Sequence, residues 1–158
     1  MTHDPFTETY IALWDMLEAD DRFASLVKHG NRVKFHEQPA RKDRLQPADT
    51  PEVRIVADEM DPHLHRTSNG SSVARVYRVE VYTNDMRITA NAFPIEWAVL
   101  RAWARAKDKL EGLEFVKSVR AVPGDPPGAD PRRRSDGWHT VLAVWVEAWF
   151  RTADLAKP

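Results

Sequence analysis

A short acidic and histidine-containing segment could ligate a metal ion. It contains, in order, Asp58, Glu59, Asp61, His63 and His65. Imidazole and carboxylate groups are ligands that zinc and manganese accept. The segment is also rich in turn-forming residues, and no predicted helix or strand holds the ligands rigid. We therefore favour a solvated turn and predict no metal site here.

Catalysis by a side chain would need a base placed beside a nucleophile. The candidate bases are Glu96 and Glu111, and the candidate nucleophiles are Ser71, Ser72 and Ser118. The Gly-x-Ser-x-Gly, Gly-x-x-x-x-Gly-Lys and Gly-x-Gly-x-x-Gly motifs do not occur. The chain has no cysteine, which excludes thiolate zinc sites, iron–sulfur clusters, Cys nucleophiles and disulfides. We predict no catalytic residue, no enzymatic activity and no cofactor.

Three consecutive arginines, Arg132, Arg133 and Arg134, could bind phosphates. They stand beside Asp130 and Asp136, in a chain whose 23 basic and 24 acidic residues leave a net charge of −1. This balance removes the bulk electrostatic argument for nucleic-acid binding. We predict that the arginines form a loop tip or contact an acidic protein surface, with no direct reading of nucleic acid.

Length and composition indicate one globular domain over residues 1–158. No apolar run approaches the roughly 20 residues that would cross a bilayer, so we expect no membrane association. The N-terminus has no basic region followed by a long apolar stretch, so we expect a cytoplasmic protein.

Hydrophobic periodicity predicts an α+β fold with the order α-α-β-β-β-α-β-β, a mainly antiparallel sheet and helices on one face. An αα unit is expected near residues 5–29, with Asp4 capping the first helix, Asp20-Asp21 capping the second and Gly30 ending it. A third helix is expected from Pro94 to Glu111. The predicted strands cover 33–35, 51–57, 73–83, 115–122 and 138–151. The stretch from Asp58 to Ser72 is expected to be turn-rich, and the polar segments 36–51 and 123–137 to be mobile loops.

Apolar residues of the third helix fall on two rows. Trp97, Leu100 and Ala104 form one row, and a second row contains Val99, Trp103, Ala106 and Leu110. We expect the two rows to make up the apolar side of the helix, with Arg101, Arg105, Lys107, Asp108 and Lys109 on its wet side.

The last strand is apolar on both faces. One face carries Leu142, Val144, Val146, Ala148 and Phe150, and the other carries Val141, Ala143, Trp145 and Trp149, with Glu147 among them. The second face is either covered within the monomer or lies at a subunit interface through Trp145 and Trp149. We take Trp145, Trp149 and the three arginines as the candidate interface residues.

Four segments carry a family resemblance: residues 16–27 (MLEADDRFASLV), 49–55 (DTPEVRI), 77–82 (YRVEVY) and 144–151 (VWVEAWFR). In their order, over about residues 5–155, the chain resembles the small tail-completion and tail-terminator proteins of long-tailed phages and prophages. The resemblance rests on the order of elements and the texture of the strands, since that family has no catalytic signature.

The resemblance implies a structural subunit that self-associates into a ring, which has six subunits in that family. The ring would join the tail to the neck of the head. Its partners would be further copies of the chain together with tail-tube and neck proteins. It would lie in the cytoplasm during assembly and in the virion tail afterwards. The loops 36–51 and 123–137 would project into the lumen or towards neighbouring rings.

Another class of function stays open. The chain is alternatively a soluble protein-binding or regulatory module, for example a dimer, that uses the Trp-bearing face of the sheet for a protein partner. A metal-dependent enzyme that uses His63 and His65 is a third and weaker hypothesis.

Overall fold

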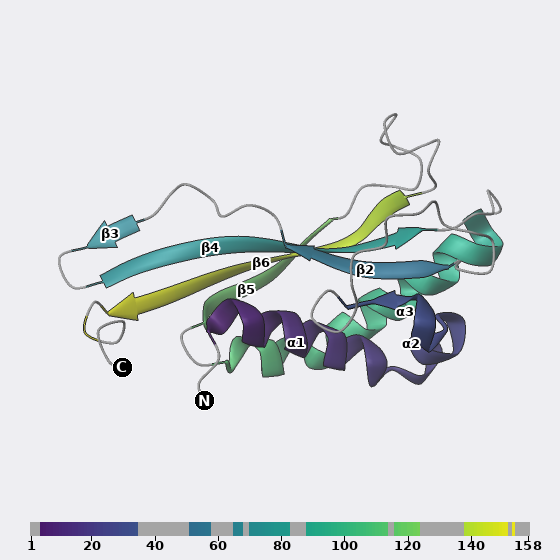
Figure 1. Cartoon of the computed structure of the whole chain (residues 1–158), viewed down its shortest axis with the longest axis horizontal. Helices are drawn as coiled ribbons and strands as arrows, with labels where there is room; N and C mark the ends of the chain where they lie inside the picture. The colour runs from purple at the N-terminus through teal and green to yellow at the C-terminus, as the bar shows by residue number, and fades with distance from the viewer. Residues whose placement is uncertain are drawn as a thin grey trace.

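Three helices lie on one face of a mixed sheet in the computed structural model, which describes residues 4–34, 51–57, 65–67, 70–82, 88–113, 116–123, 138–151 and 153 (Figure 1). The helices are α1 (Pro5–Glu18), α2 (Asp21–Leu26) and α3 (Ile88–Glu111), with a short 3-10 helix, η1 (His29–Asn31). The strands are β1 (Arg32–Val33), β2 (Glu52–Ala57), β3 (His65–Thr67), β4 (Gly70–Tyr82), β5 (Val116–Pro123) and β6 (Trp138–Arg151). The predicted α+β class and element order are confirmed, with the short β3 as an addition.

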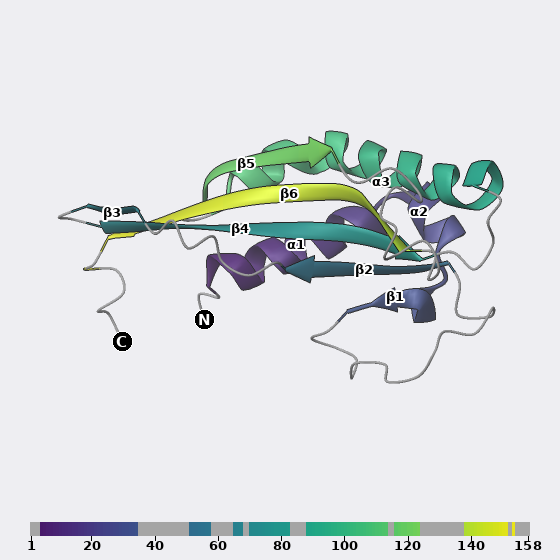
Figure 2. The same ribbon diagram turned by 90° about the horizontal axis from the view of Figure 1, so that it is seen from above.

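The strand order in the sheet is β1-β2-β4-β6-β5, and β3 pairs with β4 beside this path. The pairing of β1 with β2 is parallel, and the other pairings are antiparallel. The long strands β4 and β6 run side by side through the middle of the sheet (Figure 2). The prediction of a mainly antiparallel sheet with helices on one face is therefore confirmed.

Aspartates cap the first two helices as predicted. The Asp4 carboxylate accepts hydrogen bonds from the backbone N–H groups of Phe6 (3.0 Å) and Thr7 (2.9 Å). The Asp20 carboxylate does the same for Arg22 and Phe23, both at 3.0 Å. These bonds satisfy backbone donors that the first turn of a helix leaves without partners.

Gly30 does not end α2, contrary to the prediction. The helix ends at Leu26, and Gly30 lies in η1. The guanidinium of Arg32 instead donates to the final carbonyls, reaching the oxygen of Val27 from Nε (3.1 Å) and Nη2 (2.9 Å) and that of Ala24 from Nη2 (3.2 Å). A basic side chain thus provides the C-terminal cap for which a glycine was expected.

Two further boundaries differ from the prediction. Helix α3 begins at Ile88 and contains Pro94 in its second turn, because a proline there removes only one backbone hydrogen bond from a helix of 24 residues. The stretch predicted to be turn-rich contains β3 and the first residues of β4, which form a hairpin pairing His65 with Ser72. The polar residues of this stretch obscured its strand pattern.

The hydrophobic core lies between the helices and one face of the sheet. Tyr77 marks this face, because its hydroxyl donates to the carbonyl oxygen of Phe6 in α1 (2.9 Å). Residues that share its face in β4 and β6 alternate along each strand and are buried. They include Val79, Val81, Leu142, Val144, Val146 and Ala148. The helices contribute Leu13, Trp14, Leu17, Phe23, Ile95, Val99 and Trp103. The residues that the sequence analysis placed on one face of the last strand, from Leu142 to Ala148, therefore do share a face, and it is the face that packs on the helices.

An ionic cluster fixes the edge strand β1 against α1. Glu18 accepts from Lys34 Nζ (2.7 Å) and from Arg32 Nη1 (3.4 Å). Burial raises the pKa of Glu18, but the hydrogen bonds and charges of Lys34 and Arg32 outweigh burial and hold that pKa below its ordinary value. Lys34 Nζ also lies 5.8 Å from the centre of the Trp14 ring, within the range of a cation–π contact.

Candidate interaction surfaces

An apolar row on α3 faces solvent. We call Phe93, Trp97, Leu100 and Ala104 the α3 stripe. The large side chains Phe93, Trp97 and Leu100 are 48%, 64% and 38% exposed, and Ala104 is exposed beside them. The four positions recur at i, i+4, i+7 and i+11, which aligns them along one side of a helix.

The stripe faces away from the hydrophobic core of the chain. Helix α3 buries Ile95, Ala98, Val99, Ala102 and Trp103 against the rest of the protein. At 3.6 residues per turn, the stripe lies roughly 150° around the helix from this buried row. The expectation that both apolar rows would form one buried side is therefore wrong, because two rows so far apart cannot rest on the same layer.

Exposed apolar residues that form a continuous line have a different meaning for function from exposed apolar residues that are scattered. Single exposed apolar residues are common, but contiguous patches mark interaction surfaces. Burying a side chain of this size is worth about 1.5–3 kcal/mol relative to leaving it in water. Because the three large side chains are on average about half exposed, burying the rest of their surface would add about 2–4 kcal/mol of hydrophobic stabilisation.

Charged residues on α3 border the stripe. Glu96 lies one turn from Phe93 and Leu100, and partial burial raises the pKa of its carboxyl. Further along, Lys107 Nζ lies 3.5 Å from an oxygen of Glu111. The border thus carries both signs of charge.

The buried carboxylate of Asp20 fixes the position of α3. It accepts from Arg101 Nε (3.0 Å) and Nη2 (2.9 Å), and from Arg105 Nη1 (3.3 Å). These hydrogen bonds, led by those from Arg101, hold the pKa of Asp20 below its ordinary value although burial opposes them. Since Asp20 also caps α2, one side chain joins α2 to α3 and holds the stripe in place. Arg101, predicted to lie on the wet side, is thus partly engaged within the subunit.

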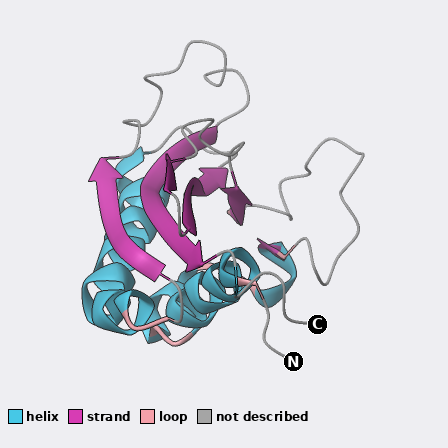
Figure 3. Ribbon diagram, turned by 90° about the vertical axis from the view of Figure 1, so that its left-hand side faces the viewer, coloured by secondary structure: helices cyan, strands magenta, loops and turns pink. Residues whose placement is uncertain are grey.

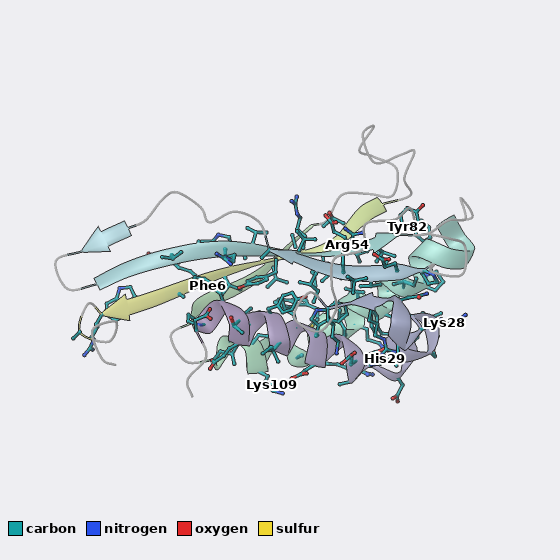
Figure 4. All side chains as sticks on the ribbon, in the orientation of Figure 1. Phe6, Lys28, His29, Arg54, Tyr82 and Lys109 are labelled. Atoms are coloured by element: carbon teal, nitrogen blue, oxygen red, sulfur yellow. The ribbon has the colours of Figure 1, made fainter. Side chains whose placement is uncertain are left out.

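A second surface lies on the side of the sheet opposite the helices. The pairings Val76↔Trp145, Ala74↔Glu147 and Ser72↔Trp149 alternate with those of the core-facing residues, so these side chains point to the other face. Within the described residues, no helix or strand packs over this face (Figures 1 and 3). In Figure 4, Arg54 and Tyr82 lie on this side of the sheet, and Phe6 lies between the sheet and α1.

The outer face, as we call this surface, has an apolar part and a charged part. The apolar part consists of Ala74 and Ala143, which are buried, and of Val76, Trp145 and Trp149, which are half-buried, with Glu147 between the two tryptophans. The charged part consists of Glu52, Arg54, Arg78 and Glu80. Glu52 is 1% exposed and accepts from Arg54 Nη2 at 3.1 Å. Among the apolar residues named here, only Val76, Trp145 and Trp149 are partly exposed.

The candidate interface residues from the sequence fall in different places. Trp145 and Trp149 are half-buried on the outer face, and the guanidinium carbon of Arg151 lies 5.9 Å from the Trp149 ring centre. Arg132, Arg133 and Arg134 lie outside the described residues, as do residues 36–50 and 124–137 of the two predicted loops.

The candidate chemical residues are not assembled into a site within the described part of the chain. Ser72 points to the outer face, whereas Glu96 belongs to α3 on the opposite side of the sheet. Glu111 is exposed and pairs with Lys107. His63 lies outside the described residues, and of His65 only the backbone, in β3, is described. The described residues contain no group of three or more potential metal ligands.

A shallow groove of about 240 Å³ lies between α1 and α3. Ala12, Met16, Ala106 and Leu110 are among its apolar lining, and Asp15, Arg105 and Lys109 among its charged lining. The residues of α3 that line this groove lie on the opposite side of the helix from the stripe, so the two surfaces are separate.

The stripe is the feature that sequence reasoning missed. The signal was present in the sequence, because apolar residues on two sides of one helix exceed what a single packed face can bury. Phe93 stood outside the predicted helix, so the row appeared one turn shorter than it is.

No family model matches the chain, and no curated protein matches it. No helix in the described part of the chain is both long and apolar enough to span a bilayer.

Proposed function

We propose that this chain is a structural subunit that assembles with copies of itself into a ring, in the manner of phage tail-terminator and tail-completion proteins. In that role it joins a tail tube to the neck of a head, and it works without a catalytic step. Its partners are further copies of the chain and the tail-tube and neck proteins. It occupies the cytoplasm during assembly and the virion tail afterwards.

The α3 stripe is the observation that carries the proposal. Trp97 at 64% exposure, with Phe93 and Leu100 in line, leaves apolar surface that association would bury. The half-buried Trp145 and Trp149 add a smaller amount of partly exposed apolar surface on the face of the sheet opposite the helices. When two different surfaces of the chain meet in a head-to-tail contact, the repeated contact closes into a ring if the rotation between neighbouring subunits is a whole fraction of a turn.

Electrostatics also permits self-association. The net charge of −1 over 158 residues gives copies of the chain little mutual repulsion. A larger net charge, in contrast, would make copies of the chain repel one another and would favour the monomer.

Negative-stain electron microscopy of the purified protein at high concentration tests the proposal. Closed rings of uniform diameter with a central channel are expected. The matched preparation carries Trp97→Glu and should contain no rings. Uniform compact dimers would instead favour the protein-binding module, and a field of single subunits would count against assembly.

A further inference from the structure

We infer that the indole ring of Trp97 in one subunit occupies the groove between α1 and α3 of the next subunit. This arrangement rests on the proposed self-association and specifies its contact. The occupant of the groove is thus a second copy of this chain, and the contact joins two different surfaces, the α3 stripe and the groove. The alternative is a symmetric contact in which two stripes meet.

The groove has the size that an indole ring needs. Its volume is about 240 Å³. A cavity of about 150 Å³ is enough to hold benzene, so a groove of this size has room for the larger, two-ring indole. The room exists because small side chains line the groove, among them Ala12 of α1 and Ala106 of α3. Trp97, 64% exposed, is the most exposed large apolar side chain in the described part of the chain.

The groove also has the chemistry that an indole ring needs. Its lining is largely apolar and includes the buried side chains of Met16 and Leu110. An indole N–H that leaves water needs a hydrogen-bond acceptor. Asp15, exposed on the α1 side of the groove, provides a carboxylate for it. The second carboxylate of the lining, that of Asp20, is already bonded to Arg101 and Arg105 of its own subunit.

The charges beside Trp97 complement the charges beside the groove. Glu96 directly precedes Trp97 and is half-buried at the border of the stripe. Arg105 and Lys109 are exposed on the α3 side of the groove. Within the described residues, the side chains of Glu96 and Lys109 have no ion pair. When Trp97 enters the groove, Glu96 comes beside these cations, and opposite charges at the edge of a contact fix its orientation.

The stripe and the groove lie on opposite sides of α3, so one subunit uses both at the same time. The groove is lined by Ala102, Ala106 and Leu110, which lie across the helix axis from Trp97. Each subunit therefore inserts Trp97 into one neighbour and receives Trp97 from another. This contact propagates from subunit to subunit, as a ring requires, whereas a stripe-to-stripe contact ends at two subunits.

A mixing experiment distinguishes the two arrangements. One subunit carries Trp97→Glu, which removes the inserted ring and keeps the groove. The other carries Ala106→Glu, which places a carboxylate in the groove and keeps Trp97. Each variant alone should remain a single subunit by light scattering. Their equimolar mixture should form a two-subunit complex and nothing larger, since the Trp97 side chain of one subunit meets the intact groove of the other.

The controls separate failure of this contact from failure of the proposed function. Ser25→Glu adds the same charge at an exposed position of α2, outside both surfaces, and should assemble like the wild type. If the wild type does not associate, the proposed function and this contact both fail. If the wild type assembles but the mixture gives no two-subunit complex, or either variant alone associates, only the contact of Trp97 with the groove is overturned. Ala12→Glu replaces Ala106→Glu if circular dichroism shows that the latter is unfolded.

Cross-linking locates the contact directly, because the chain has no cysteine of its own. Subunits with Leu100→Cys, beside Trp97 on the stripe, are mixed with subunits with Ala19→Cys, at an exposed position of the groove lining. The mixture is treated with a short bis-maleimide. Covalent dimers of the mixed type are expected to exceed the dimers formed by either variant alone at least several-fold. Equal or stronger cross-linking of Leu100→Cys with itself would overturn the contact and support stripe-to-stripe pairing.

Discussion

At the scale of single residues, Asp20 has two separable tasks. Its carboxylate caps α2 and also accepts hydrogen bonds from Arg101 and Arg105 of α3. Asparagine is a comparable N-cap but carries no charge. Replacing Asp20 with asparagine therefore removes the ion pairs and spares most of the cap.

We predict that Asp20→Ala lowers the free energy of unfolding by about 2 kcal/mol or more, and that Asp20→Asn lowers it by less. Urea unfolding of the wild type and both variants at neutral pH measures the two losses. Equal losses for the two variants would show that capping by Asp20 contributes little to stability. No loss for either variant would contradict both the cap and the ion pairs.

The pH dependence of this stabilisation follows from the lowered pKa of Asp20. A carboxylate whose pKa is lower in the folded state stabilises the fold fully above its unfolded pKa, and the contribution is lost as pH falls through the folded pKa. The difference in unfolding free energy between the wild type and Asp20→Asn should therefore be constant near neutrality and shrink in acid. A difference that grows in acid would contradict the assignment.

Tyr77 contributes one hydrogen bond between the sheet and α1. Its hydroxyl donates to the Phe6 carbonyl, and burial raises the pKa of the phenol well above its ordinary value. We predict that Tyr77→Phe lowers the free energy of unfolding by about 1 kcal/mol. Denaturant titration measures this loss, and a loss near zero would mean that water replaces the hydroxyl at that carbonyl.

At the scale of elements, the two tryptophans of α3 should behave oppositely. Trp103 is 9% exposed within the core, so Trp103→Ala should lower the free energy of unfolding by about 3–5 kcal/mol. Trp97→Gln should change it by no more than about 0.5 kcal/mol, because the side chain is largely in water. The measurement is made at low protein concentration, where association does not contribute. A large loss for Trp97→Gln would place the stripe in the core of the subunit.

The elements with a clear local pattern could be predicted from the sequence. The bounds of β6 match the expectation of 138–151, since apolar residues fill the stretch from Val141 to Phe150 except at Glu147. The start of α3 could not be predicted, because proline at position 94 resembles a helix start and Arg87, directly before Ile88, is not a capping residue. The end of α2 depends on Arg32, whose contact forms only once the chain has folded back.

The candidate surfaces were predictable in part. Successive side chains of β6 alternate between the two faces of the sheet. It could therefore be predicted that Trp145 and Trp149 share a face and that Val144 and Val146 lie on the other. Which row of α3 is buried depends on where α1 and the sheet lie, and that is decided by tertiary contacts such as Asp20 with Arg101. Periodicity alone could not choose between the rows.

At the scale of the whole molecule, the fold leaves the apolar α3 stripe exposed on the side of the helix away from the core. The helices cover one face of the sheet (Figures 1 and 3), and the large side chains of the stripe are exposed on α3. Under the proposed self-association, copies of the chain bury this stripe by repeating one contact around a ring. The account therefore requires that mass increases with concentration and then stops increasing when the ring closes.

Light scattering behind size exclusion, over concentrations from micromolar to near-millimolar, tests this claim most directly. We predict that the mass of the wild type rises from that of the 18.1 kDa chain to a multimer that no longer grows, and that Trp97→Glu stays at the mass of one chain. A wild type that remains a single chain at every concentration, or a Trp97→Glu variant with the same masses as the wild type, would contradict the account.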